Sequence, residues 1–129
     1  GLYVQWNVGM ISPSVWIENS LFRNNSAPEG GGGIGVNAEN SGGGNIVVVG
    51  SEFANNSASG FYGGGLLVYF AHPAADNYIR IENCSFVVNL AMGGGGVCVF
   101  FLDLAVNNTL TVESVSFAAL MILFVGSMQ

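Results

Sequence analysis

The sequence predicts an all-β fold, a right-handed, single-stranded parallel β-helix of about four coils. The first observation is an aromatic residue that returns every 31 to 33 positions, at Phe22, Phe53, Phe86 and Phe117. The second is that similar neighbours return with it at fixed offsets, and the third is a glycine run that follows three of the four. A period of about 20–50 residues built from short period-2 apolar patterns is typical of a solenoid.

Each repeat opens with an aliphatic-x-aliphatic segment, which predicts a strand with two inward side chains. In the third repeat Ile79 and Ile81 point inward, and Arg80 between them points outward. Corresponding pairs lie before the other three phenylalanines: Val15 and Ile17, Ile46 and Val48, Leu110 and Val112. We therefore expect this first strand to stack in register through all four coils.

The phenylalanine itself belongs to a second short strand, Cys84-Ser85-Phe86 in the third repeat. The four phenylalanines are then expected to stack inside the coil as an aromatic ladder. Three positions after the first three of them come Asn25, Asn56 and Asn89. These asparagines are expected to stack as an amide ladder at one corner, each bonding its neighbour's backbone or amide, as in cross-β stacks.

The glycine run brings backbones close together and permits unusual dihedral angles. An aliphatic-x-valine segment follows it, Val97-Cys98-Val99 in the third repeat, and predicts a third strand in each coil. We therefore expect one domain, residues 1–129, with coils at approximately 1–33, 34–65, 66–96 and 97–129. The alternative is an antiparallel β-sandwich, but a sandwich has no reason to repeat the same residues at the same offsets.

The pairing of Phe-x-x-Asn with a Gly-Gly-aliphatic segment resembles the repeats of chlamydial polymorphic outer-membrane proteins. Related repeats occur in surface proteins of algae and other microbial eukaryotes. The motif reads Phe22-Arg23-Asn24-Asn25, Phe53-Ala54-Asn55-Asn56 and Phe86-Val87-Val88-Asn89 here, and the likeness covers most of the chain. The resemblance implies the pectate-lyase-like β-helix, a scaffold that serves adhesins, passenger domains, lyases and fibres alike.

The fourth repeat departs from this pattern. Leu120 replaces the asparagine, and the glycine run is reduced to Gly126. Residues 117–125 are all apolar, whereas a terminal cap normally has a polar outer face. Gly1-Leu2-Tyr3-Val4 matches the segments at 33–36, 65–68 and 96–99, so the chain spans close to a whole number of coils. We expect either head-to-tail stacking of copies into an open filament or an excerpt of a longer solenoid.

Four Asn-x-Ser/Thr sequons are present, and N-linked glycosylation requires such sequons at exposed positions. Their acceptor residues are Asn24, Asn55, Asn83 and Asn107. Asn24 and Asn55 are expected to point outward at the same corner of successive coils, with Asn83 at another corner and Asn107 in a loop. We expect some of them to carry glycans, which would supply solubility to a chain with only 8% charged residues.

The composition excludes several function classes. A net charge of −6 with Arg23 and Arg80 as the only basic residues argues against nucleic-acid binding. The longest apolar run has nine residues, and a membrane-spanning helix needs about 20. A polysaccharide lyase needs aspartates for calcium and a positioned base, and His72 stands alone in a loop. With only two threonines in the chain, flat ice-binding faces are not expected either.

We also expect no metal site and no cofactor. Glu18, Glu82 and Glu113 share one offset, four residues before the phenylalanine, and are expected to be solvated carboxylates, because a calcium site needs six or more oxygen ligands. Cys84 is expected to point inward and Cys98 outward, as two free thiols.

Tyr69 and Phe100 are expected to face outward beside each other, and Trp16 and Val47 are expected to do so on another face. Exposed side chains of this kind either form a contact surface or are covered by the intervening loops.

These patterns together predict a non-enzymatic, extracellular structural module. It would be a glycosylated β-helical subunit or segment of a surface fibre or appendage, whose partners are its own copies or adjoining coils. The alternative is an adhesin, a surface-binding β-helix segment of a larger secreted or outer-membrane protein.

Overall fold

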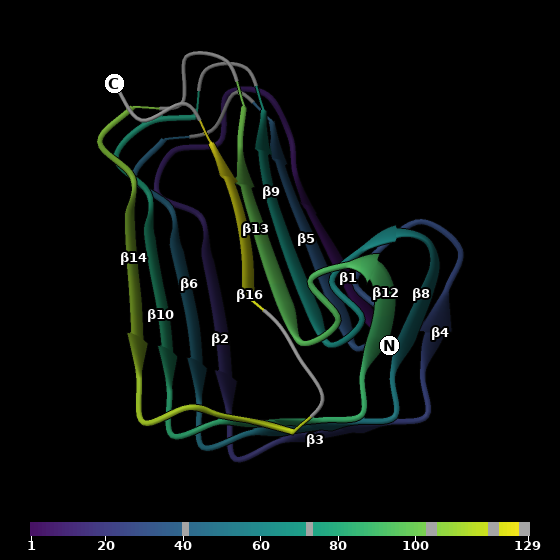
Figure 1. The fold of residues 1–129 in the computed structure, drawn as a ribbon. Coiled ribbons are helices and arrows are strands. Elements are labelled where there is room, and N and C mark those ends of the chain that lie inside the picture. Colours follow the sequence, from purple (N-terminus) through teal and green to yellow (C-terminus); the bar gives the residue numbers. More distant parts are fainter. Residues whose placement is uncertain (40–41, 72–73, 103–105, 119–121, 127–129) are drawn as a thin grey trace.

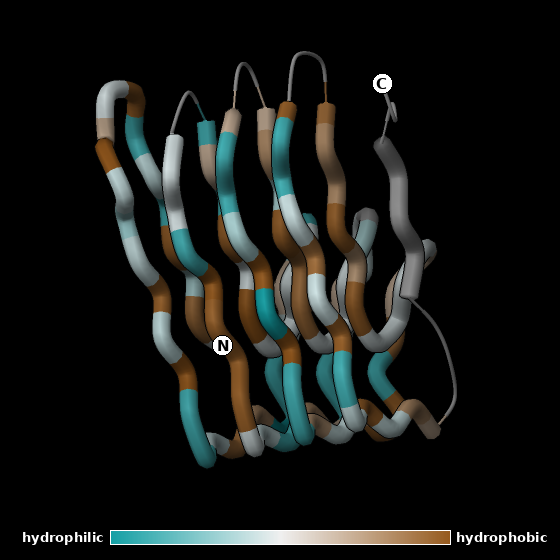
Figure 2. Tube along the Cα trace, turned by 90° about the vertical axis from the view of Figure 1, so that its left-hand side faces the viewer, coloured by the Kyte–Doolittle hydropathy of each residue, from teal (hydrophilic) through white to brown (hydrophobic). Residues whose placement is uncertain are grey.

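The computed structural model describes residues 1–39, 42–71, 74–102, 106–118 and 122–126. These residues form a β-solenoid of about four turns in which every paired strand is parallel to its neighbours. Paired residues lie one coil apart in the sequence, as in Leu2↔Ile34 and Phe22↔Phe53. Successive coils therefore run side by side (Figure 2), and the predicted parallel β-helix is confirmed.

Three sheets enclose the interior (Figure 1). The first holds β1 (Leu2–Trp6), β5 (Ile34–Glu39), β9 (Leu66–Ala71), β13 (Val97–Phe101) and β16 (Ile122–Gly126). The second holds β2 (Ser14–Glu18), β6 (Asn45–Val49), β10 (Tyr78–Glu82) and β14 (Thr109–Glu113). The third holds β3 (Leu21–Arg23), β7 (Glu52–Ala54), β11 (Ser85–Val87) and β15 (Ser116–Ala118).

A fourth sheet stands outside this triangle, and the sequence patterns did not predict it. It consists of β4 (Ser26–Ala27), β8 (Ser57–Tyr62) and β12 (Leu90–Gly93), which we call the arm. In Figure 1 the arm leaves the third sheet, rises beside the first sheet and bends back toward it. The predicted number of three strands per coil is therefore too low. Strands pair through their backbones, so the arm stacks although its three strands have two, six and four residues.

The interior is filled by the inward residues of the three sheets. Phe22, Phe53, Phe86 and Phe117 stack with ring centroids 5.1, 4.6 and 5.2 Å apart and interplanar angles of 9, 7 and 16°. The predicted aromatic ladder is confirmed.

A second aromatic column was not predicted. The rings of Phe70 and Phe101 stack at 5.3 Å and 3°, and Trp6 meets Phe70 at 6.5 Å. The coil between them carries Ala38, whose small side chain leaves room for the indole.

Candidate functional site

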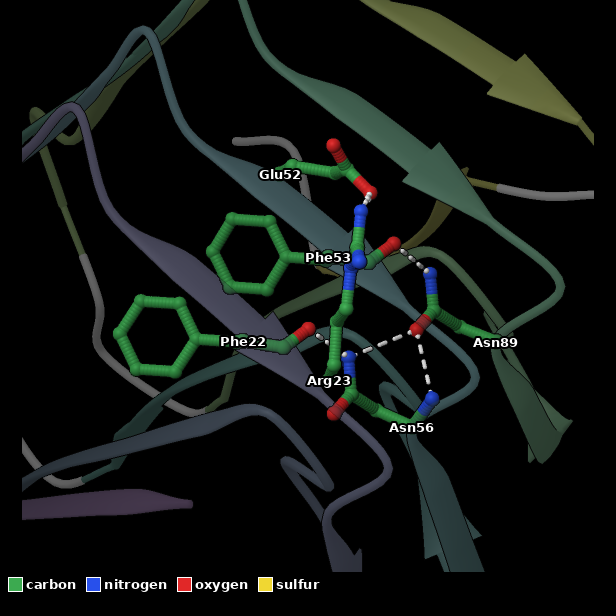
Figure 3. Close-up of polar contacts among 6 residues, drawn as sticks. All are labelled: Phe22, Arg23, Glu52, Phe53, Asn56 and Asn89. Atoms are coloured by element: carbon green, nitrogen blue, oxygen red, sulfur yellow. Dashed lines mark hydrogen bonds and ion pairs between the residues drawn. The ribbon is translucent and has the colours of Figure 1, made fainter.

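The amide ladder occupies the corner between the third sheet and the arm. Asn56 Oδ1 accepts hydrogen bonds from Asn25 N and Nδ2 at 3.0 and 2.9 Å, and Asn89 Oδ1 accepts the same pair from Asn56 (Figure 3). Asn56 Nδ2 also donates to Phe22 O, and Asn89 Nδ2 donates to Phe53 O, both at 2.9 Å. Asn56 and Asn89 are buried, and burying their side-chain amides without hydrogen bonds would cost free energy. The ladder supplies these hydrogen bonds. The expected ladder is confirmed, and its role is structural.

A second amide ladder lies at the corner before the second sheet. Asn108 Oδ1 accepts from Asn77 N and Nδ2 at 3.0 and 2.9 Å, and Asn77 Oδ1 accepts from Gly44 N at 2.9 Å. The sequence patterns did not predict it, because it spans only two coils. The available signal was that both asparagines lie nine residues before their phenylalanine.

Three columns of corner residues share the left-handed backbone conformation. The first is Ser12, Gly43, Asp76 and Asn107; the second is Asn19, Gly50, Asn83 and Ser114; the third is Asn24, Asn55 and Val88. Glycine and asparagine tolerate a positive φ better than most residues. Many of the asparagines and glycines of this chain are therefore explained by the turns of the coil.

All four sequon asparagines lie in these corners. Their side chains are exposed, and φ is 55° at Asn24, 54° at Asn55, 50° at Asn83 and 54° at Asn107. Asn24 and Asn55 follow each other in one column, and Asn83 lies at another corner, as expected. Asn107 turns out to be a corner residue of the coil, directly before the second sheet. Exposed turns give a glycosyl acceptor the access it needs, and whether these residues carry glycans stays a prediction.

The carboxylates expected in one column are indeed neighbours: Glu82 pairs with Glu113 across β10 and β14. Glu82 forms an ion pair with Arg80 two residues before it in β10. Among the residues that the structure describes, no three histidine, cysteine or acidic side chains come together as a possible metal site. His72 lies outside the described residues.

Both cysteines are free and buried. Cys84 points into the interior and Cys98 points outward from β13, both as expected. Cys98 is nevertheless buried, with an exposed fraction of 0%, because the turn at Gly94, directly after the arm, covers it. Burial raises the pKa of the Cys98 thiol to about 12 and also raises the pKa of Cys84. Neither thiol is therefore an activated nucleophile.

The expected aromatic surfaces are partly covered. Tyr69 and Phe100 lie side by side with centroids 6.1 Å apart, but Tyr62 of the arm packs edge-on against Phe100 at 4.6 Å and leaves it buried. Trp16 and Val47 are neighbours on the outer side of the second sheet, as predicted, but only Trp16 is exposed, and Val47 is buried. Val47 lies between Trp16 and Arg80 in its column, and these longer side chains flank it on both sides.

The described residues include no helix of the length and hydrophobicity needed to cross a membrane. Comparison of the chain with protein-family models, with curated proteins and with solved structures finds no match in any of the three. The function of the chain must therefore be inferred from the geometry of the coil itself.

Proposed function

We propose that this chain is a structural part of an extracellular, glycosylated fibre or surface appendage, in which β-helical coils stack head to tail. The observation that carries the proposal is the pair of open ends. One end presents the free edges of β1, β2, β3 and β4, and the other presents those of β14, β15, β12 and β16. Unpaired strand edges are templates for a further strand.

The apolar residues at these ends support stacking. The first coil exposes Leu2, Tyr3, Val8, Ile11 and Leu21, with Ile11 at 89% exposure. At the opposite end Leu110, Val112 and Phe117 pack against the core but stay partly open. Leu120, which takes the asparagine's place in the fourth coil, lies outside the described residues. Further coils on either end would extend the phenylalanine column and cover these side chains, whether they come from a second copy or from the same polypeptide.

The sequons support an extracellular location. Their four asparagines are exposed at the corners of the coil, so glycans would project sideways and leave both ends free to stack. In a secretory expression host we expect the intact mass to fall after treatment with an N-glycosidase. An unchanged mass would contradict this part of the proposal.

Imaging of the purified chain tests the stacking itself. We expect rods whose length grows with protein concentration, because each end is complementary to the other rather than to itself. Leu2→Arg places a charge at the edge of the first coil and is expected to shorten or abolish the rods. Tyr78→Arg is the matched control, because Tyr78 is exposed on β10, which is paired on both sides with β6 and β14 and forms no free edge. Monodisperse single particles of the unaltered chain at all concentrations would contradict self-stacking.

The alternative, an adhesin segment, is favoured by one observation, a pocket lined with aromatic side chains on the outer side of the first sheet. Binding of a soluble single chain to arrayed surface ligands, without rod formation, would support the adhesin over the fibre.

A further inference from the structure

The arm and the outer side of the first sheet enclose a pocket of about 500 Å³. This volume lies within the range of about 300–1,000 Å³ that small-molecule sites in proteins occupy. Its floor is lined by residues of β1, β5, β9 and β13, and its opposite wall by Tyr62 of the arm and by Glu29 and Gly30, which follow β4. Gly35 lies between Tyr3 and Leu67 in the floor, and the absence of a side chain there keeps the floor open.

Aromatic rings form much of the lining. Tyr3, Tyr62, Tyr69 and Phe100 come from four different strands and are far apart in the sequence. Their planes are inclined: Tyr62 meets Phe100 at 68°, and Tyr69 meets Phe100 at 56°. Tyr3 is 64% exposed and Tyr69 is partly exposed, so their faces are accessible to a ligand. Inclined aromatic faces around one space attract a cation through the negative potential of the rings.

The charges around the pocket favour a cation as well. Glu29 lines it from the arm side and is exposed. Glu39 is exposed on the same outer side of β5, two residues beyond Asn37. The two arginines of the chain, which has no lysine, are Arg23 and Arg80, and they are paired with Glu52 and Glu82 in other sheets. A chain of net charge −6 would also steer a cation toward this site.

One polar group in the lining points to a ligand that donates hydrogen bonds. Asn37 Oδ1 is shielded from solvent and accepts no hydrogen bond, and it is the one such side-chain atom among the described residues. A buried acceptor without a donor costs about 1–3 kcal/mol. A ligand that reaches Asn37 with an N–H group would recover this cost, whereas a quaternary ammonium ion has no N–H to offer.

We propose that this pocket binds the guanidinium group of an arginine side chain from a peptide partner. A guanidinium is planar and stacks on tyrosine rings, and it donates several hydrogen bonds in its plane. Tyr3 and Tyr69 would contact its faces, Asn37 would accept one N–H, and Glu29 would balance the charge. The proposal does not rest on the proposed fibre. It applies to the unstacked chain, in which Tyr3 is exposed, because a further coil on the first would also contact Tyr3.

Titration of the full chain with N-acetyl-arginine-N-methylamide tests the proposal, with the tyrosine ring signals followed by NMR spectroscopy. We expect saturable shifts of Tyr3 and Tyr69 and none of Tyr78, a tyrosine on the second sheet. The matched probe is the citrulline derivative, whose ureido group has nearly the same planar shape and keeps N–H donors, but carries a carbonyl oxygen in place of one amino group and no charge. We expect it to bind about tenfold more weakly, because it lacks the cation–π attraction and the pairing with Glu29.

Two variants and one control locate the site. Tyr69→Ala is expected to weaken arginine binding about fivefold through loss of a stacking face. Glu29→Gln is expected to weaken it about threefold, and this exposed substitution leaves the core intact. Glu18→Gln is the control, since Glu18 is equally exposed but lies on β2, and no change is expected.

Equal affinity for the arginine and citrulline derivatives would overturn the proposal. So would an equal effect of Glu29→Gln and Glu18→Gln, or saturable shifts at Tyr78 rather than at Tyr3. Tetramethylammonium binding as tightly as arginine would show an unspecific cation site, and shifts caused by a neutral disaccharide alone would show a saccharide site. Either result contradicts the role of Asn37 as an acceptor for guanidinium N–H groups.

Discussion

The corner that carries the amide ladder and the arm that follows it are adjacent in the chain but built on different principles. At the corner the same residue type recurs in each of the three coils that form the ladder, and Asn56 and Asn89 are buried. In the arm the strands have two, six and four residues, and the register shifts between Ala91 and Gly93. Side-chain identity thus repeats in the corner ladder and in Ala27, Ala58 and Ala91 at the start of the arm, and it varies beyond these alanines.

The strongest test of this contrast is Asn56→Ala at the corner. The substitution removes the acceptor of two Asn25 donors and the donor to Phe22 O, in a site closed to water. We expect a loss of about 3–5 kcal/mol in the free energy of unfolding, measured by urea denaturation. Asn55→Gly is the control, since Asn55 is exposed and glycine tolerates its φ of 54°. Similar losses in both variants would show that burial of the ladder contributes little.

The junction between the arm and the first sheet gives the second test. A Cβ at Gly64 would lie 2.5 Å from Gly95 O and from Leu90 O, which are backbone atoms that cannot rotate away. We expect Gly64→Ala to cost about 2–3 kcal/mol in the free energy of unfolding.

Gly42→Ala is the matched control, because its nearest neighbour, Ala75 O, would be 3.5 Å away. We expect a change within about 0.5 kcal/mol there. A tolerated Gly64→Ala would show that the arm can move away from the sheet.

The third and smallest effect measures how well the arm shelters the outer side of the first sheet. The pKa of Cys98 is raised to about 12 in the folded chain and starts from 9.0 when exposed. The folded state therefore holds the thiol proton of Cys98 more tightly than the unfolded state does. The resulting contribution to the free energy of unfolding is complete below pH 9 and is lost as the pH rises toward 12. We expect a loss of about 1 kcal/mol between pH 9 and pH 10 from this thiol. The measurement is urea denaturation at both pH values.

Cys98→Ala separates this thiol from the other groups that titrate at alkaline pH. The variant should lose correspondingly less stability over the same interval, whatever its stability at pH 7. Identical pH dependence in both proteins would mean that solvent reaches Cys98 beneath the arm.

The same contrast explains how much could be predicted from the sequence. The phenylalanine column, the aliphatic strands and the amide ladder were predictable, because direct stacking forces the same residues to recur at the same offsets. The arm was not, although Ala27, Ala58 and Ala91 each lie five residues after their phenylalanine, because one recurring small residue does not distinguish a strand from a turn. The burial of Cys98 and the pocket both depend on the position of the arm, so neither could be predicted from the sequence. The only sequence signal for the Asn77–Asn108 ladder was that each asparagine lies nine residues before its phenylalanine.

The amide ladders also give the coil a direction. Every ladder oxygen faces the preceding coil: Asn56 Oδ1 accepts from Asn25, Asn108 Oδ1 accepts from Asn77, and Asn25 Oδ1 accepts from the amino group of Gly1 at 2.7 Å. A neighbour that meets the first coil must therefore bring donors, and one that meets the opposite end must bring acceptors. Two identical ends brought face to face would oppose like dipoles. Any array of such coils would be polar, with every member oriented in the same sense.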